Sequence, residues 1–198
     1  MTFKNLFFLL IMAVVGALEV SAQTDNAVID CIMTRTSVRA YSDRAIPDEI
    51  VETLLRAGMA APSAVNKQPW TFVVISNDAV KDSIAASFKT AKMVASAPLA
   101  IVVCGNIDNT FTGDTRRIGN WTLDCSAATE NILLAAHALG LGGVWCGIYP
   151  VEERAEKLRA ILDLPANLEP FNIISLGYPK APSTPKDKWA PSKVIYRK

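Results

Sequence analysis

The 198-residue sequence has little histidine, no paired cysteines and no excess of charge of either sign. His137 is the only histidine, and the four cysteines include no CxxC pair. These absences disfavour a zinc site built from Cys and His and catalysis by a histidine base. With 20 basic and 19 acidic residues the net charge is +1, so we expect no nucleic-acid partner.

The cysteines lie where this residue usually serves as a small hydrophobic side chain. Cys104 and Cys146 fall in apolar strand patterns, and Cys125 falls in a long helical pattern. These positions argue against disulfides, although an even number of cysteines in an exported chain permits them.

The first 22 residues are typical of a secretory signal peptide. Lys4 precedes an almost wholly apolar run over residues 6–18, and small residues end at Ala22. The run is shorter than the ~18 to 20 residues that cross a bilayer, so no stable membrane insertion is expected after cleavage. We expect residues 23–198 to form one domain with an extended C-terminal tail, exported and periplasmic. If residues 1–22 are instead a helix of the fold, the protein is cytoplasmic.

Hydrophobic periodicity predicts helices alternating with strands. Helices are expected over residues 28–34, 48–60, 78–89, 121–139 and 151–162, and strands over 70–75, 99–104, 142–149 and 171–177. The helix over 121–139 is so apolar that it belongs at the centre of the molecule or at a subunit contact. Residues 105–119 form a lid or a simple connection, and the proline-rich tail over 179–198 lies along another surface.

The segment Ala61–Trp70 carries Ser, Asn, Lys and Gln between two prolines, Pro62 and Pro69. Proline fixes its own φ angle and biases the preceding residue toward extended geometry, so few backbone conformers compete. A stiff loop of donors and acceptors suits a flat polar ligand. An ordinary turn interrupted by proline is the alternative.

A second polar motif, Arg35–Arg39, follows the first predicted helix. If this segment is extended, Arg35, Ser37 and Arg39 point to one side. The planar guanidinium fork matches phosphate oxygens, so two arginines with a hydroxyl between them favour a phosphate site. The alternative is a solvated basic strand.

Together with the segments Gly140–Pro150 and Gly177–Pro179, these two motifs resemble the FMN-dependent nitroreductase family, over residues 30 to about 193. The resemblance implies an α+β fold with a central, mainly antiparallel sheet flanked by helices. It also implies an intertwined homodimer with two FMN molecules at the subunit interface.

The resemblance assigns roles to the motifs. The first motif would hold the FMN phosphate and ribityl end, the loop would reach the isoalloxazine from the opposing subunit or its edge, and the backbone near Gly147 would approach the reactive nitrogen. Two tail lysines stand where an arginine is common in the family, so a single contact would replace a forked one. The implied cofactor-binding residues are Arg35, Thr36, Ser37, Arg39, Pro62, Ser63, Ala64, Asn66, Gln68, Cys146, Gly147, Ile148, Lys186 and Lys188.

The activity implied by the resemblance is electron transfer from NAD(P)H through FMN to a nitroaromatic, quinone or similar acceptor, in a ping-pong cycle. The flavin carries the electrons, so no catalytic side chain and no metal are expected. Two alternatives remain: an exported flavin-binding or storage protein without turnover, and a flavin enzyme of the same fold with non-reductive chemistry. Because NAD(P)H is scarce outside the cytoplasm, either the donor of an exported enzyme is another compound or the signal interpretation is wrong.

Overall fold

The computed structural model describes residues 26–111 and 119–198, which divide into two units at Thr34. The described part of the first unit holds one helix, α2 (Ala27–Thr34). The predicted signal peptide lies outside the described residues, as does much of the polar connection predicted over 105–119. Within the described ranges, no helix combines the length and the apolar character needed to span a bilayer.

The second unit is built on four antiparallel strands, β1 (Trp70–Ile75), β2 (Leu99–Asn106), β3 (Gly142–Gly147) and β4 (Leu168–Gly177). Their order in the sheet is β1-β2-β4-β3, so β3 forms one edge. The central strands β2 and β4 are almost entirely buried because helices cover both faces of the sheet.

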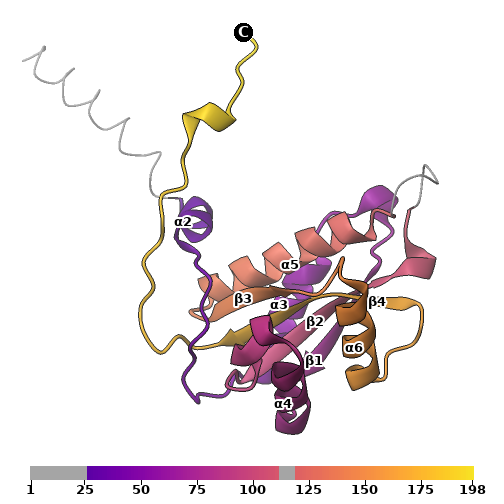
Figure 1. The fold of residues 1–198 in the computed structure, drawn as a ribbon. Coiled ribbons are helices and arrows are strands. Elements are labelled where there is room, and N and C mark those ends of the chain that lie inside the picture. Colours follow the sequence, from indigo (N-terminus) through magenta and orange to yellow (C-terminus); the bar gives the residue numbers. More distant parts are fainter. Residues whose placement is uncertain (1–25, 112–118) are drawn as a thin grey trace, which may run out of the picture. The chain divides into compact units, whose positions relative to one another are not determined.

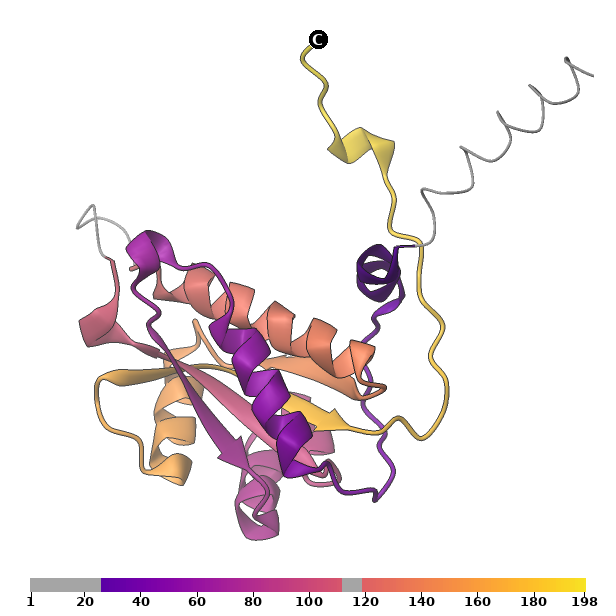
Figure 2. The ribbon, with the colours of Figure 1, turned by 180° about the vertical axis from the view of Figure 1, so that it is seen from behind.

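One face of the sheet carries α3 (Asp48–Met59) and α5 (Trp121–Ala138), and the other carries α4 (Asp78–Ser87) and α6 (Glu152–Leu162) (Figures 1 and 2). A separate apolar core fills the space on each side. Leu54 and Ile132 are fully buried in the first core, and Ile84 and Leu158 in the second. Each such side chain contributes about 1.5–3 kcal/mol of hydrophobic stabilisation.

The predicted α+β fold is therefore confirmed, with shifts at the ends of elements. The ladder of β3 ends at Gly147 rather than at Tyr149, because the amides of Ile148 and Tyr149 both donate to the Phe171 carbonyl. Four short 3-10 turns were not expected from periodicity: η1 (Ala64–Asn66), η2 (Lys89–Val94), η3 (Ile107–Asn109) and η4 (Pro191–Lys193).

Cys104, Cys125 and Cys146 are free thiols buried in the apolar cores. Burial raises the pKa of the Cys104 thiol to about 12 and also raises the pKa of Cys125. These two thiols are therefore neutral at physiological pH, which agrees with the expected role of small hydrophobic side chains.

Candidate functional site

The Arg35–Arg39 segment runs beside the edge strand β3. The Val38 amide donates to the Gly143 carbonyl at 3.1 Å, and Ser37 forms a parallel bridge with Gly143. The approach is close because Gly142 has no side chain: a Cβ there would lie 2.6 Å from the Val38 side chain. The glycines at the start of β3 thus allow the basic segment to pack against the sheet.

Tyr41 anchors the far end of this segment. Its ring is buried, and its hydroxyl lies 2.6 Å from the Val38 carbonyl and 3.1 Å from the Ser175 carbonyl. Burial raises the pKa of Tyr41 to about 12, so the phenol remains a neutral hydrogen-bond donor. The backbone from which the arginines project is therefore held at Val38, through both its amide and its carbonyl.

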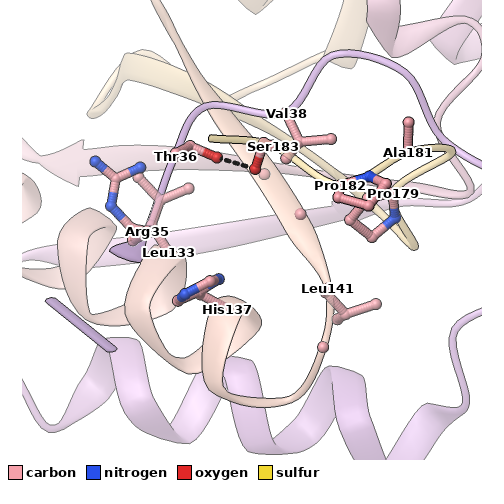
Figure 3. A pocket seen from close by; sticks show the side chains of 13 residues that line it. Arg35, Thr36, Val38, Leu133, His137, Leu141, Pro179, Ala181, Pro182 and Ser183 are labelled. Carbon is pink, nitrogen blue, oxygen red and sulfur yellow. Dashed lines mark hydrogen bonds between the residues drawn. The ribbon is translucent and has the colours of Figure 1, made fainter. Parts of the chain in front are cut away.

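A pocket of about 290 Å³ opens beside Arg35, between the last turns of α5 and the start of the tail (Figure 3). The Arg35 Nε lies 3.1 Å from Glu130 Oε1, which holds the guanidinium at the pocket wall. The hydroxyls of Thr36 and Ser183 are hydrogen-bonded to each other on another wall. A cation and two hydroxyls around one pocket provide hydrogen-bond donors for the oxygens of a phosphate group.

The structure groups Arg35 with Thr36 rather than with Ser37 and Arg39. Arg35 and Thr36 line the pocket, whereas Ser37 and Arg39 are exposed and lie outside its lining. The alternation expected for a strand does not hold, because Ser37 forms only an isolated bridge and the segment is not a regular strand.

Further along, β3 presents an open position at Gly147. A Cβ there would meet nothing nearer than Trp145 Nε1 at 4.0 Å. The Gly143 carbonyl points to the outer edge, so the backbone groups of Trp145 and Gly147, two and four residues on, point the same way. Cys146 and Ile148 are instead buried in the second core.

Arg39 lies close enough to this end of β3 to act on it electrostatically. Burial raises the pKa of the Cys146 thiol, while the Arg39 and Arg154 guanidiniums oppose that rise. Both guanidiniums therefore favour negative charge at Cys146, the neighbour of Gly147.

The loop between α3 and β1 has an unusual backbone. The φ angles of Val65, Asn66 and Gln68 are 45°, 57° and 49°. These values lie in the left-handed region, which residues other than glycine seldom adopt. For the β-branched Val65 this conformation is strained. The polar loop predicted as a ligand wall is thus held in a costly shape.

Hydrogen bonds hold that shape. Within the loop, the backbone amide of Gln68 donates to Ser63 Oγ at 2.9 Å, and its side-chain Nε2 donates to Asn66 Oδ1 at 2.9 Å. From α5, Asp124 Oδ1 accepts the Ala64 amide at 3.0 Å. Asp124 is buried, and in the described structure its second oxygen, Oδ2, has no hydrogen-bond partner.

The loop and the Arg35 pocket lie at opposite ends of α5. Asp124 contacts the loop and His137 lines the pocket, so at 1.5 Å per residue the two are separated by about 20 Å along the helix. One chain does not bring the two predicted halves of the site together.

The predicted tail lysines, Lys186 and Lys188, are exposed and do not line the Arg35 pocket. The tail residues that do line it come earlier, over Pro179–Ser183. Within residues 26–111 and 119–198 there is no group of His, Cys, Asp or Glu that could hold a metal ion.

Sequence reasoning missed the residues that support the site, namely Tyr41, Asp124, Glu130 and Ser183. Asp124, Glu130 and Ser183 contact segments far away in the sequence, as Tyr41 does at Ser175, so periodicity contains no signal for these contacts. A carboxylate on an otherwise apolar helix, such as Asp124, is the one hint available, because burying a charge needs a partner.

The sequence profile described as the Nitroreductase family matches residues 32–92 and 85–178. A Methanothermobacter thermautotrophicus protein named "Putative NADH dehydrogenase/NAD(P)H nitroreductase" is 41% identical over 171 residues, which cover 86% of this chain and 87% of that protein.

Solved structures give the same likeness. A protein of that name from Bacteroides thetaiotaomicron superposes with a TM-score of 0.81 at 44% identity, covering 87% of this chain and 98% of the other. A "putative nitroreductase in complex with FMN" from Desulfovibrio desulfuricans superposes with a TM-score of 0.78 at 33% identity, covering 88% and 99% of the two chains.

Proposed function

The chain belongs to the nitroreductase family and is an FMN-dependent NAD(P)H oxidoreductase, and from this premise we propose that it reduces nitroaromatic, quinone or similar planar acceptors in a ping-pong cycle. The observation that carries the proposal is the course of one segment along β3. It places Arg35 and Arg39 beside a strand whose Gly147 is open to a ring.

The residues present fit FMN. The phosphate would have Arg35 and the Thr36 and Ser183 hydroxyls at one pocket. The ring has the open backbone edge at Gly147, where no side chain intervenes. When bound, FMN supplies the two-electron chemistry, and the protein supplies orientation and electrostatics.

The side chains near Gly147 favour a planar acceptor. Trp145 is 37% exposed, and its indole packs edge-on against Phe171 with ring centroids 5.3 Å apart. Its Nε1 lies beside the space over Gly147, so the site offers an aromatic wall and one N–H donor. Cys146 takes no covalent part in this proposal, because its thiol is buried with a raised pKa.

We also propose that the site is completed by a second copy of the chain. Loop residues Pro62–Gln68 lie about 20 Å along α5 from the Arg35 pocket of the same chain, as the helical rise gives. In a homodimer, the loop of one subunit would approach the β3 edge of the other. The strained but hydrogen-bonded loop is pre-organised for such a contact.

The absorbance spectrum tests the proposed function. The purified protein, incubated with FMN and desalted, should retain the flavin bands and bleach on addition of NADH or NADPH. A colourless protein would refute FMN binding. A yellow protein that neither nicotinamide bleaches would favour the storage alternative.

Two substitutions test the position of FMN. Arg35→Ala removes a charge-assisted contact, for which we expect more than tenfold weaker FMN binding, about 1.5–3 kcal/mol. Gly147→Val adds a branched side chain in open space, so we expect normal folding but weak FMN binding. Arg56→Ala, which removes an exposed arginine on α3, is the control. FMN affinity that is unchanged in both test variants would place the cofactor elsewhere.

We further propose that the chain is exported with residues 1–22 as signal peptide, which lie outside the described residues. The apolar run behind Lys4 and the small residues before Gln23 support this. Mass spectrometry of the protein made in a secreting host should find Gln23 first. An intact Met1 in a soluble fraction would refute export.

A further inference from the structure

A second pocket, of about 320 Å³, lies on the opposite face of the sheet from α5. It is lined by the end of α4, the start of η2 and the first turns of α6. The helices α4 and α6 contact each other (Figure 1). Three cations line it, Lys89, Arg154 and Lys157, with Glu153 as the one acidic residue. Its walls therefore carry a net charge of +2.

Glu153 precedes Lys157 by four residues, which favours that pair, but the positions of the two α6 cations also carry electrostatic costs. Arg154 and Lys157 lie three residues apart on one face of α6, where like charges repel each other. Arg154 is also the third residue of α6, at the positive end of the helix dipole, where a cation is unfavourable. An anion in the pocket would offset both costs.

The pocket also offers neutral donors and an ordered cation. Arg154 Nη2 donates to Thr90 Oγ1, and its guanidinium lies 5.8 Å from the Phe88 ring centroid. This fixes Arg154 against the wall while Lys157 and Lys89 remain exposed. A fixed guanidinium, a hydroxyl and two exposed ammonium groups suit phosphate oxygens.

The pocket is near the proposed ring position. Val151, on its rim, follows Gly147 by four residues, so at most about 14 Å of chain separates them. Arg154 also acts electrostatically on Cys146, the neighbour of Gly147. A ligand that reaches from the Gly147 edge can therefore extend to the cations.

We propose that this pocket binds phosphate groups of the nicotinamide dinucleotide whose nicotinamide end reaches the Gly147 edge. The inference rests on the proposed function, because it assigns the pocket to the electron donor of that reaction. Two parts of the donor share the chemistry: the pyrophosphate, common to NADH and NADPH, and the 2′-phosphate, present in NADPH alone.

Steady-state kinetics of the FMN-loaded enzyme test the proposal. Lys157→Gln and the double variant Arg154→Gln/Lys157→Gln are compared with wild type and with the control Arg56→Gln, an exposed arginine on the other face of the sheet. We expect the double variant to raise KM for a dinucleotide about tenfold, as lost charge-assisted contacts do, with kcat unchanged. A higher KM for NADPH alone would assign the pocket to the 2′-phosphate. A higher KM for both dinucleotides would assign it to the pyrophosphate. Unchanged KM for both would overturn the proposal.

Calorimetry separates this inference from the proposed function. Titration with ADP, which carries a diphosphate, and with adenosine 2′-monophosphate should show binding to wild type that weakens about fivefold or more in the double variant and with added KCl. Equal binding of both probes to wild type and double variant, or binding of neither, would overturn the pocket assignment. The FMN spectrum reports on the proposed function independently, and unfolding temperatures show whether the variants remain folded.

Discussion

The contact between Asp124 and the loop gives the sharpest test of how the site is built. The Ala64 amide donates to Asp124 Oδ1 at 3.0 Å, and this bond joins the loop to the first turns of α5. It acts on a segment in which Val65 occupies a left-handed conformation that costs about 1–3 kcal/mol. A hydrogen bond to a charged group is worth about 1.5–3 kcal/mol, so the two terms are comparable.

Removing the carboxylate should therefore loosen the loop and weaken the fold. For Asp124→Ala we expect the free energy of unfolding to fall by about 1.5–3 kcal/mol, a loss of about 3–12 °C in Tm for a chain of this size. For Asp124→Asn, which keeps an oxygen acceptor without the charge, we expect roughly half of that loss. FMN affinity should fall in the same order, because a mobile loop must be ordered again on binding.

Thermal unfolding and the quenching of FMN fluorescence measure the two effects. Asp82→Ala, which removes an exposed aspartate on α4, is the control and should change neither. An Asp124→Ala variant with wild-type Tm and wild-type FMN affinity would refute the reasoning. A loss of stability without any loss of FMN affinity would show that the loop is not part of the cofactor site.

Three further predictions follow from features already described. In the native protein, a thiol reagent should label only the partly exposed Cys31 rapidly, and fast labelling of all four thiols would contradict their burial. The pKa of Cys104 lies near 9 in the unfolded chain and about 12 in the folded one. Unfolding therefore releases a proton, and urea unfolding should show stability falling between about pH 9 and 12, by at most about 1.4 kcal/mol per unit for that thiol and less steeply in Cys104→Ala. Mixing Arg35→Ala chains with Gln68→Ala chains should restore some FMN binding through mixed dimers with one intact site, and mixtures no better than the single variants would refute a shared site.

The arrangement of helices and strands was accessible from the sequence because its signals are local. The run Trp70–Ile75 is a strand at the predicted bounds, and α5 differs from its prediction by one residue. The motifs also identified which segments carry polar groups. Periodicity and turn chemistry depend on near neighbours in the chain, which a single sequence contains.

The internal geometry of the site was not accessible in the same way. Extended alternation predicted that Arg35 and Ser37 share a side, yet Ser37 pairs with Gly143 while Arg35 forms an ion pair with Glu130. No propensity predicts a left-handed Val65, because α5 and the loop hold it there together. Such features depend on contacts between segments far apart in the sequence.

The outer edge of β3 has a consequence for the life of the unliganded chain. Ser37 covers this edge only at Gly143, and the described residues place no strand beyond it. An uncovered edge is a template on which other chains can add strands, so a chain that folds before it binds flavin is exposed to aggregation. Flavin supply during synthesis should therefore set the yield of soluble protein as well as its colour.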